Sequence, residues 1–170
     1  LCSADSTYRL FGAVTIGNIV SSVPLQDQVV EGGALAPLVT VANAADLETQ
    51  RCIAYALCNL AADPRRRTDI VKEGGLPSLI SMACSDDRSD QLAAMATLRG
   101  ISAQAENRRG VFLAGVGEAL TLGTRSIDME VKIETAAVLA ALSINDENKL
   151  EMSQDDKLLV SLIELVKVSD

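Results

Sequence analysis

The sequence predicts an all-α protein built from stacked helical repeats, an α-solenoid. Related apolar blocks begin 41 residues apart, at Ile16, Leu57, Leu98 and Leu139, and regular periods of this length are typical of repeat proteins. Within each block a second apolar residue follows three residues later, which is helical spacing. Aromatic residues make up only 2% of the 170 residues, whereas hydrophobic residues make up 48%. The core therefore has to be aliphatic, which suits packed helices better than a β-sandwich.

Each repeat is expected to hold a short helix, a glycine-rich turn, a second helix, a polar turn and a longer third helix. Glycine in the first turn supplies a positive φ between two helices. Asp46, Asp87 or Ser89, and Asp128 in the polar turns are expected to cap the third helices that follow. One repeat cannot bury its apolar face alone, but stacked copies can. We predict a single domain with a partial repeat at 1–22, repeats at 23–62, 63–103 and 104–144, and a partial repeat at 145–170.

The aligned third helices also predict the core. The first apolar column is Ile16, Leu57, Leu98 and Leu139, and the second is Ile19, Leu60, Ile101 and Leu142. Both columns are expected to be buried between helices.

The repeats resemble the armadillo family. The clearest copy combines IVKEGGLPSLI (70–80) with QRCIAYALCNLA (50–61), and is similar to the family's Gly-Gly-x-Pro turn and to its third helix ending in A-[WY]-A-L-x-N-L. HEAT repeats usually lack both features. The resemblance covers nearly the whole chain. It implies a right-handed superhelix whose third helices line a concave groove for partner proteins, and a fragment of a longer protein.

Helix geometry predicts which side chains face that groove. At about 100° per residue, positions 48, 52, 55 and 59 form one stripe, well away from Leu57 and Leu60. The repeat period carries this stripe to the other third helices. The predicted groove residues are Phe11, Val14, Asn18, Glu48, Cys52, Tyr55, Asn59, Glu130 and Glu134.

The resemblance implies that two asparagines bond to the partner's backbone. Asn18 and Asn59 match the family's ladder asparagine, whose amide can donate to and accept from the backbone of an extended peptide. Tyr55 lies one turn before Asn59, and its ring can hold an aliphatic or cationic stem. The alternative is that Asn59 bonds to neighbouring backbone and that Tyr55 is a packed side chain.

Acidic side chains give the predicted groove its charge. Glu48, Glu130, Glu134 and Asp90 are expected on the inner surface, where they would favour a basic partner segment. A solvated helix face is the alternative. At the ladder positions of the later copies, Gly100 and Ala141 replace the amide. An import adaptor, which needs an array of Trp and Asn, therefore fits less well.

Composition argues against several other functions. The net charge of −8 and the pI of about 4.6 oppose binding to nucleic acid or to anionic membranes. There is no histidine, so no catalytic residues, metal ligands or cofactor are expected. The glycine pairs lack the spacing of a nucleotide-binding loop. Neither direct membrane insertion nor a small-molecule substrate is expected.

Two other sequence features have plain interpretations. Arg65, Arg66 and Arg67 fall in a turn and a short first helix, so they are expected to form a solvated edge. The four cysteines, at positions 2, 52, 58 and 84, are interpreted as buried free thiols in a reducing compartment. This suggests a cytoplasmic protein, with a nuclear location also open.

The sequence thus predicts a non-enzymatic scaffold that binds a protein or peptide segment in the concave groove. Three alternatives remain: the substrate-recruiting region of a ubiquitin ligase, a structural component of a cytoskeletal or ciliary assembly, and a membrane tether like the vacuolar armadillo proteins.

Overall fold

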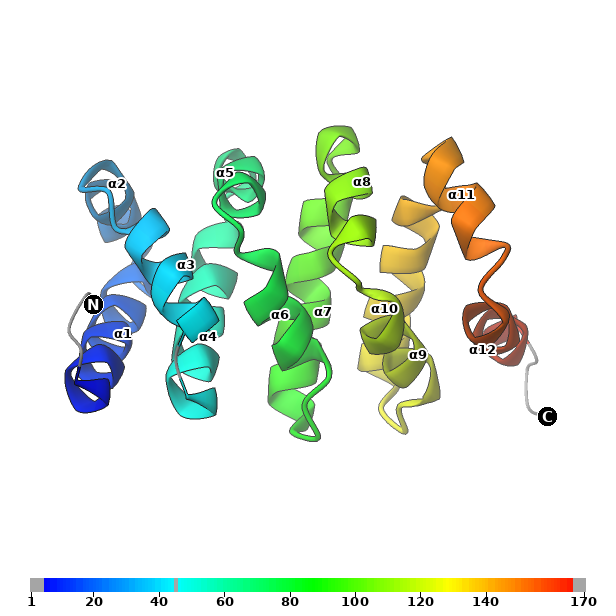
Figure 1. Cartoon of the computed structure of the whole chain (residues 1–170), viewed down its shortest axis with the longest axis horizontal. Helices are drawn as coiled ribbons and strands as arrows, with labels where there is room; N and C mark the ends of the chain where they lie inside the picture. Colours follow the sequence, from blue (N-terminus) through cyan, green and yellow to red (C-terminus); the bar gives the residue numbers. More distant parts are fainter. Residues whose placement is uncertain (1–4, 45, 167–170) are drawn as a thin grey trace. The chain divides into compact units, whose positions relative to one another are not determined.

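The computed structural model describes residues 5–44 and 46–166, and these residues form helices joined by short turns, with no strand among them (Figure 1). The all-α class predicted from the sequence is therefore confirmed. The helices are α1 (Ser6–Val20), α2 (Val23–Glu31), α3 (Leu35–Ala44), α4 (Leu47–Ala61), α5 (Arg67–Lys72), α6 (Leu76–Ala83), α7 (Arg88–Ser102), α8 (Ala105–Leu113), α9 (Gly117–Arg125), α10 (Met129–Leu142), α11 (Asp146–Met152) and α12 (Asp156–Val166), and a 3-10 turn, η1 (Pro64–Arg66), precedes α5.

The chain divides into two compact units, Leu1–Met82 and Ala83–Asp170. We call them unit 1 and unit 2 and describe each by itself. The long third helices are α1 and α4 in unit 1, and α7 and α10 in unit 2.

Aspartate side chains cap the third helices. Asp46 Oδ1 accepts a hydrogen bond from Thr49 N (3.0 Å), Asp87 Oδ1 from Ser89 N (2.8 Å) and Asp128 Oδ1 from Glu130 N (2.9 Å). The three predicted caps are confirmed. Asp5, which the sequence argument overlooked, caps α1 in the same way. These bonds satisfy amide groups that have no acceptor within the helix.

Glycines set the turn before each second helix. Gly33, Gly74 and Gly115 have φ values of 76°, 86° and 86°, which residues with a Cβ rarely adopt. Gly75 is needed for a different reason, since a Cβ there would lie 2.8 Å from Ile70 Cγ2. The expectation that glycine supplies a positive φ between these helices is confirmed.

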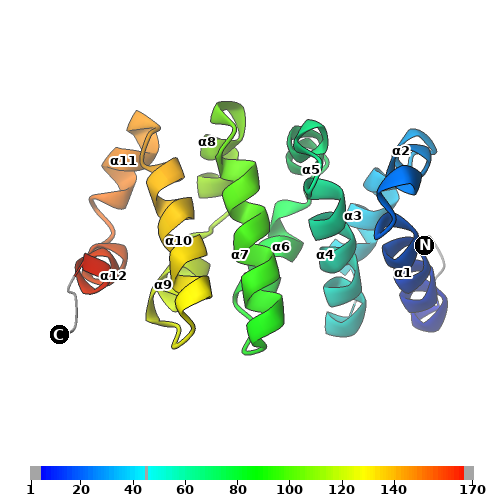
Figure 2. The ribbon, with the colours of Figure 1, turned by 180° about the vertical axis from the view of Figure 1, so that it is seen from behind.

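In unit 1, α1 packs on α4 and α2, and α4 also packs on α3 (Figure 2). Leu57 and Leu60 are buried as predicted. The prediction for α1 was wrong, because Ile16 is only half-buried and Ile19 is 36% exposed. Helix α1 buries Ala13 and Val20 instead. Among the described residues, no counterpart of α3 precedes α1 to cover the isoleucines.

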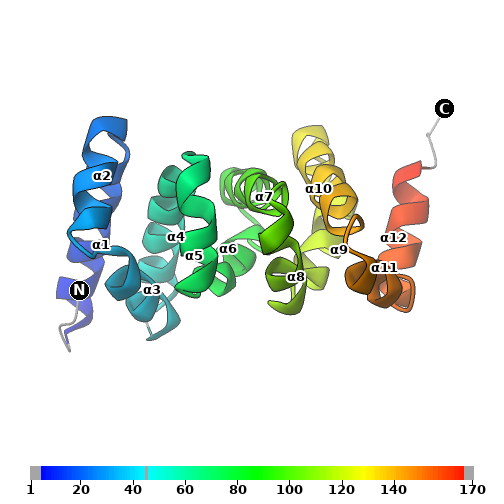
Figure 3. The same ribbon diagram turned by 90° about the horizontal axis from the view of Figure 1, so that it is seen from above.

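In unit 2, α7 packs on α10, and α9 packs on α10 and α12. Seen from above, α8 lies against α7, α10 and α11 (Figure 3). Both apolar columns are buried here, since Leu98, Ile101 and Leu142 are fully covered and Leu139 is nearly so. The predicted core is confirmed in this unit.

Candidate functional site

A shallow cavity of about 210 Å³ lies between α1 and α4 in unit 1. Its lining residues are Val14, Gly17, Asn18, Ser21, Cys52, Tyr55 and Asn59. Five of these seven belong to the predicted groove stripe. The structure therefore brings the two ladder asparagines and the tyrosine to one depression, although they come from helices far apart in the sequence.

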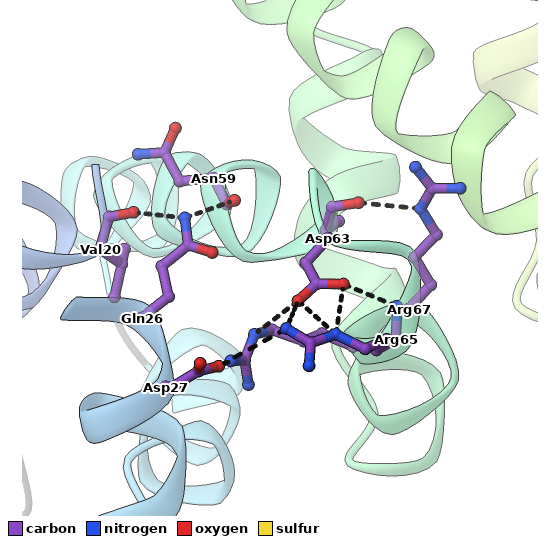
Figure 4. A network of polar contacts seen from close by, with 9 residues as sticks. Val20, Gln26, Asp27, Asn59, Asp63, Arg65 and Arg67 are labelled. Atoms are coloured by element: carbon purple, nitrogen blue, oxygen red, sulfur yellow. Dashed lines mark hydrogen bonds and ion pairs between the residues drawn. The ribbon is translucent and has the colours of Figure 1, made fainter. Parts of the chain in front are cut away.

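The amide groups of Asn18 and Asn59 are available to a ligand. Asn18 uses its backbone oxygen to accept from Ser21 Oγ (2.7 Å), and Asn59 uses its backbone oxygen to accept from Gln26 Nε2 (3.1 Å). Neither side-chain amide has a hydrogen-bond partner among the described residues. Figure 4 shows the Asn59 side chain pointing away from Gln26, with only its backbone oxygen bonded. The alternative in which the Asn59 amide bonds to neighbouring backbone does not occur.

Gln26 holds the two helices of the cavity together. This buried side chain of α2 donates through Nε2 to Val20 O at the end of α1 (2.8 Å) and to Asn59 O near the end of α4 (3.1 Å) (Figure 4). Both carbonyls belong to the last turn of a helix, where no helical partner exists. Sequence reasoning missed Gln26, because glutamine in a short helix is usually exposed.

The two other predicted groove residues of unit 1, Phe11 and Glu48, do not line the cavity. Phe11 is 64% exposed on α1, and Glu48 is exposed at the start of α4. Glu48 makes no ion pair within the described part of the chain. Burial, followed by the negative charge of Glu48, raises the pKa of the Cys52 thiol. At neutral pH the Cys52 thiol is therefore protonated, and it lines the cavity without acting as a nucleophile.

The corresponding acids of unit 2 are paired. Glu130 Oε2 accepts from Arg88 Nη2 (2.6 Å), and Glu134 Oε2 accepts from Arg99 Nε. Each pair joins α10 to α7. The two predicted groove acids are thus present at the surface, but their charge is already matched within the unit.

Asp90 does not contribute to the inner surface, so this prediction was wrong. Its side chain is 2% exposed and accepts a hydrogen bond from Ser85 Oγ (3.2 Å). Asp90 directly follows the stripe position Ser89, and one residue turns a helix by about 100°. That rotation carries the carboxylate from the stripe into the unit.

The remaining stripe of unit 2 consists of small residues. Ala93, Ala96 and Gly100 on α7, and Ala137 and Ala141 on α10, are all half-buried. Side chains this small offer neither a hydrogen-bonding group nor a ring to a ligand.

Two members of the arginine run, Arg65 and Arg66, are paired with carboxylates in unit 1. Arg65 bonds to Asp63 Oδ2 through Nη2 (2.6 Å), and Arg66 pairs with Asp27 (Figure 4). The Arg65 side chain keeps the pKa of Asp63 below its usual range. The expected solvated edge holds for Arg65 only, because the Arg66 side chain is 11% exposed and Arg67 is half-buried, donating through Nε to Ala61 O (2.8 Å).

The thiols differ in part from the expectation. Cys52, Cys58 and Cys84 are free, as predicted, but they are half-buried instead of fully buried. Cys2 lies outside the described residues. Within the described ranges, no group of three potential metal-ligating side chains comes together. In the same part of the chain, no helix has the length and apolar composition needed to cross a membrane.

No protein-family model and no curated protein matches the sequence. Solved structures do match it. One is a computationally designed armadillo repeat protein for modular peptide recognition, with a TM-score of 0.74 and 19% identity over 96% of this chain and 76% of that chain. A designed armadillo repeat protein in complex with the peptide (KR)4 has a TM-score of 0.73 and 21% identity over 99% and 72% of the two chains. An engineered protein has a TM-score of 0.73 and 27% identity over 100% and 70%. The chain therefore has an armadillo-like repeat fold, an all-α solenoid.

Proposed function

We propose that this chain is a non-enzymatic scaffold that binds an extended, basic segment of a partner protein across α1 and α4 of unit 1. The observation that carries the proposal is the pair of unpartnered amides, Asn18 and Asn59, which line one cavity beside Tyr55. An exposed polar side chain with a fixed position and no internal partner is suited to bonding a ligand.

The amide chemistry supports an extended peptide as the ligand. Each asparagine offers a donor and an acceptor, which match the N–H and C=O groups of a peptide backbone. Such bonds hold any sequence, and neighbouring side chains add selectivity. Gln26 fixes the ends of α1 and α4 relative to each other, so the two amides are held in position before the ligand arrives.

Charge supports a basic segment. Glu48 borders the site without an ion pair among the described residues, and the whole chain carries a net charge of −8. An unpaired carboxylate on the same helix as an aromatic ring, as with Glu48 and Tyr55 on α4, favours a Lys or Arg side chain in the partner. One structural neighbour is a designed armadillo repeat protein in complex with the basic peptide (KR)4, which supplies a probe.

The test is a titration of the chain with fluorescently labelled (KR)4. We expect the double variant Asn18→Ala/Asn59→Ala to bind about thirtyfold more weakly, because each asparagine loses about 1 kcal/mol of hydrogen bonding. Tyr55→Ala should weaken binding further. Because these substitutions keep the net charge, the loss cannot come from changed attraction between an acidic protein and a basic peptide.

Gln28→Ala is the matched control, since it removes an exposed amide of α2 away from the cavity. Its affinity for (KR)4 should equal that of the unsubstituted chain. Equal affinity of the asparagine double variant and the control would refute binding through the amides. Circular dichroism melts should show that the variants remain folded.

A further inference from the structure

A second, larger cavity lies in unit 2, where α8, α9 and the start of α12 meet. Its volume is about 860 Å³, within the range of roughly 300–1,000 Å³ that is common for ligand sites. Phe112 of α8, Leu122 of α9 and Leu158 of α12 form its apolar wall. None of its residues belongs to a third helix, so it is separate from the stripe described above.

The cavity exists because one leucine of the repeat is missing. Two residues after the positive-φ glycine, the second helices α3 and α6 begin with Leu35 and Leu76, and both side chains are buried. At the same place α9 begins with Gly117, which lines the cavity. A Cβ on Gly117 would meet only Asp155 Oδ2, at 3.9 Å. The space that sister repeats fill with a leucine is therefore open to solvent here.

The placement of the aromatic residues independently indicates an interaction surface. The chain has two Tyr and two Phe among 170 residues. Tyr8, Phe11 and Tyr55 lie on the third helices of unit 1, and the fourth, Phe112, lines this cavity. Leu122 is 41% exposed beside it. Aromatic residues are enriched at the centres of protein interfaces, and this chain uses none of them in its fully buried core.

The rim of the cavity favours a basic neighbour. Glu118 and Asp155 line the cavity, and neither forms an ion pair with any described residue, although Asp155 Oδ1 accepts from Lys157 N (3.0 Å) and Leu158 N (3.1 Å) at the start of α12. Arg125 is compensated by Glu164, at 3.6 Å. Lys157 is the one cation on the rim without an ion pair in the described part of the chain. Two carboxylates without an ion pair thus line the cavity together with one such ammonium group, and this balance favours a basic neighbour.

We propose that this cavity binds a partner protein by receiving a leucine side chain flanked by Lys or Arg. The leucine occupies the place that Leu35 and Leu76 occupy in their own repeats, against Phe112 and Leu158. The flanking cations lie against Glu118 and Asp155. The site is independent of the α1 and α4 cavity and does not rest on the function proposed for it.

The test uses three short peptides and the intact, ¹⁵N-labelled chain. The probes are acetyl-Lys-Leu-Lys-amide, acetyl-Lys-Ala-Lys-amide and acetyl-Glu-Leu-Glu-amide, and the readout is the NMR shift of the Gly115 and Gly117 backbone amides. We expect the Lys-Leu-Lys peptide to shift both amides in a saturable way, with at least fivefold weaker binding of the other two. Simultaneous readout of Asn18 and Asn59 separates this site from the unit 1 cavity.

Gly117→Leu tests the geometry, because it restores the repeat's own leucine. This variant should raise the melting temperature and reduce binding of the Lys-Leu-Lys peptide at Gly115 at least tenfold. Gly117→Ala is the matched control and should retain binding, since one methyl group leaves the cavity open. Leu122→Ser, on the exposed wall, should weaken binding at least threefold.

Three results would overturn the proposal: equal binding of the leucine and alanine peptides, full binding to Gly117→Leu, or no shift of Gly115 and Gly117 at saturating peptide. If Gly117→Leu does not fold, the Leu122→Ser variant and the peptide comparison decide the matter alone. A failure here with intact (KR)4 binding in unit 1 would leave the function proposed for unit 1 untouched.

Discussion

The third helices of the two units have the same backbone structure, but the side chains on their groove-facing stripes differ. On α1 and α4 the ladder positions hold Asn18 and Asn59, and an aromatic ring stands one turn before Asn59. On α7 and α10 the same positions hold Gly100 and Ala141. The acid of unit 1, Glu48, has no ion pair among the described residues, whereas both acids of unit 2 are paired with arginines.

This difference shows which residues maintain the repeat and which are free to diverge. Cap aspartates, turn glycines and buried aliphatic residues recur in both units. The exposed stripe does not recur, because it contributes little to packing and is limited mainly by what it binds. We therefore expect recognition in unit 1 and a largely structural face in unit 2.

The largest expected effect concerns the buried amides that tie helix ends together. Gln26→Leu removes two hydrogen bonds of unit 1, and Asn148→Leu removes the bonds to Arg108 O (3.2 Å) and Leu142 O (3.3 Å) in unit 2. Each substitution should lower the free energy of unfolding by about 1–3 kcal/mol, measured by urea denaturation. Only Gln26→Leu should also weaken (KR)4 binding, because only Gln26 positions α1 against α4. Equal loss of peptide binding in both variants would remove the distinction between the units.

A smaller effect is expected when Glu134 of unit 2 loses its ion-pair partner. Arg99→Ala leaves Glu134 without its partner, and such exposed pairs contribute about 0–1 kcal/mol to stability. The melting temperature should change little, while (KR)4 affinity at low salt should rise about twofold and return to the original value at high salt. Arg99→Ala/Glu134→Gln, which removes both charges of the pair, is the control. An affinity increase that persists at high salt would contradict an electrostatic origin.

The smallest effect concerns the loss, at low pH, of the stability that the aspartate caps provide. The backbone hydrogen bond from Thr49 lowers the pKa of Asp46 from its usual value, and the side-chain hydrogen bond from Arg88 lowers that of Asp128. A lowered folded-state pKa gives stability that is complete above the ordinary pKa and is lost as the pH falls through the folded-state value. The free energy of unfolding should therefore fall below about pH 4. Asp46→Asn and Asp128→Asn should each flatten this fall.

The salt dependence of the free energy of unfolding should then differ between the Asp46 and Asp128 caps. About 0.5 M NaCl should reduce the contribution of Asp128, whose partner is an exposed arginine, more than that of Asp46. The comparison is made by repeating the denaturation of both variants at low and high salt. An identical salt response would mean that Arg88 does not hold Asp128.

Local rules made much of the fold predictable. The cap aspartates and the turn glycines follow from helix-end chemistry, and the period repeats them. The burial of Leu98 and Leu142 follows from helical spacing on two helices of unit 2, α7 and α10, that pack on each other. Ile19 is an exception to this burial pattern. The period predicts which face of a helix is apolar, but not whether another helix covers that face.

Side-chain pairing across helices was not predictable in the same way. The pairs Arg88–Glu130 and Arg99–Glu134 join residues 42 and 35 positions apart, and no single-helix argument relates them. The same holds for Gln26, whose two acceptors come from α1 and α4. At Asp90 the error was one residue, which is enough to move a side chain from the surface to the interior.

The regular caps and turns also have an evolutionary consequence. Because Asp5, Asp46, Asp87 and Asp128 each start a third helix independently of what its exposed side carries, a mutation on that side leaves the helix start in place. Each repeat can therefore acquire or lose affinity for a ligand separately from the others. The presence of amides on α1 and α4 and their absence from the ladder positions of α7 and α10 fit such independence.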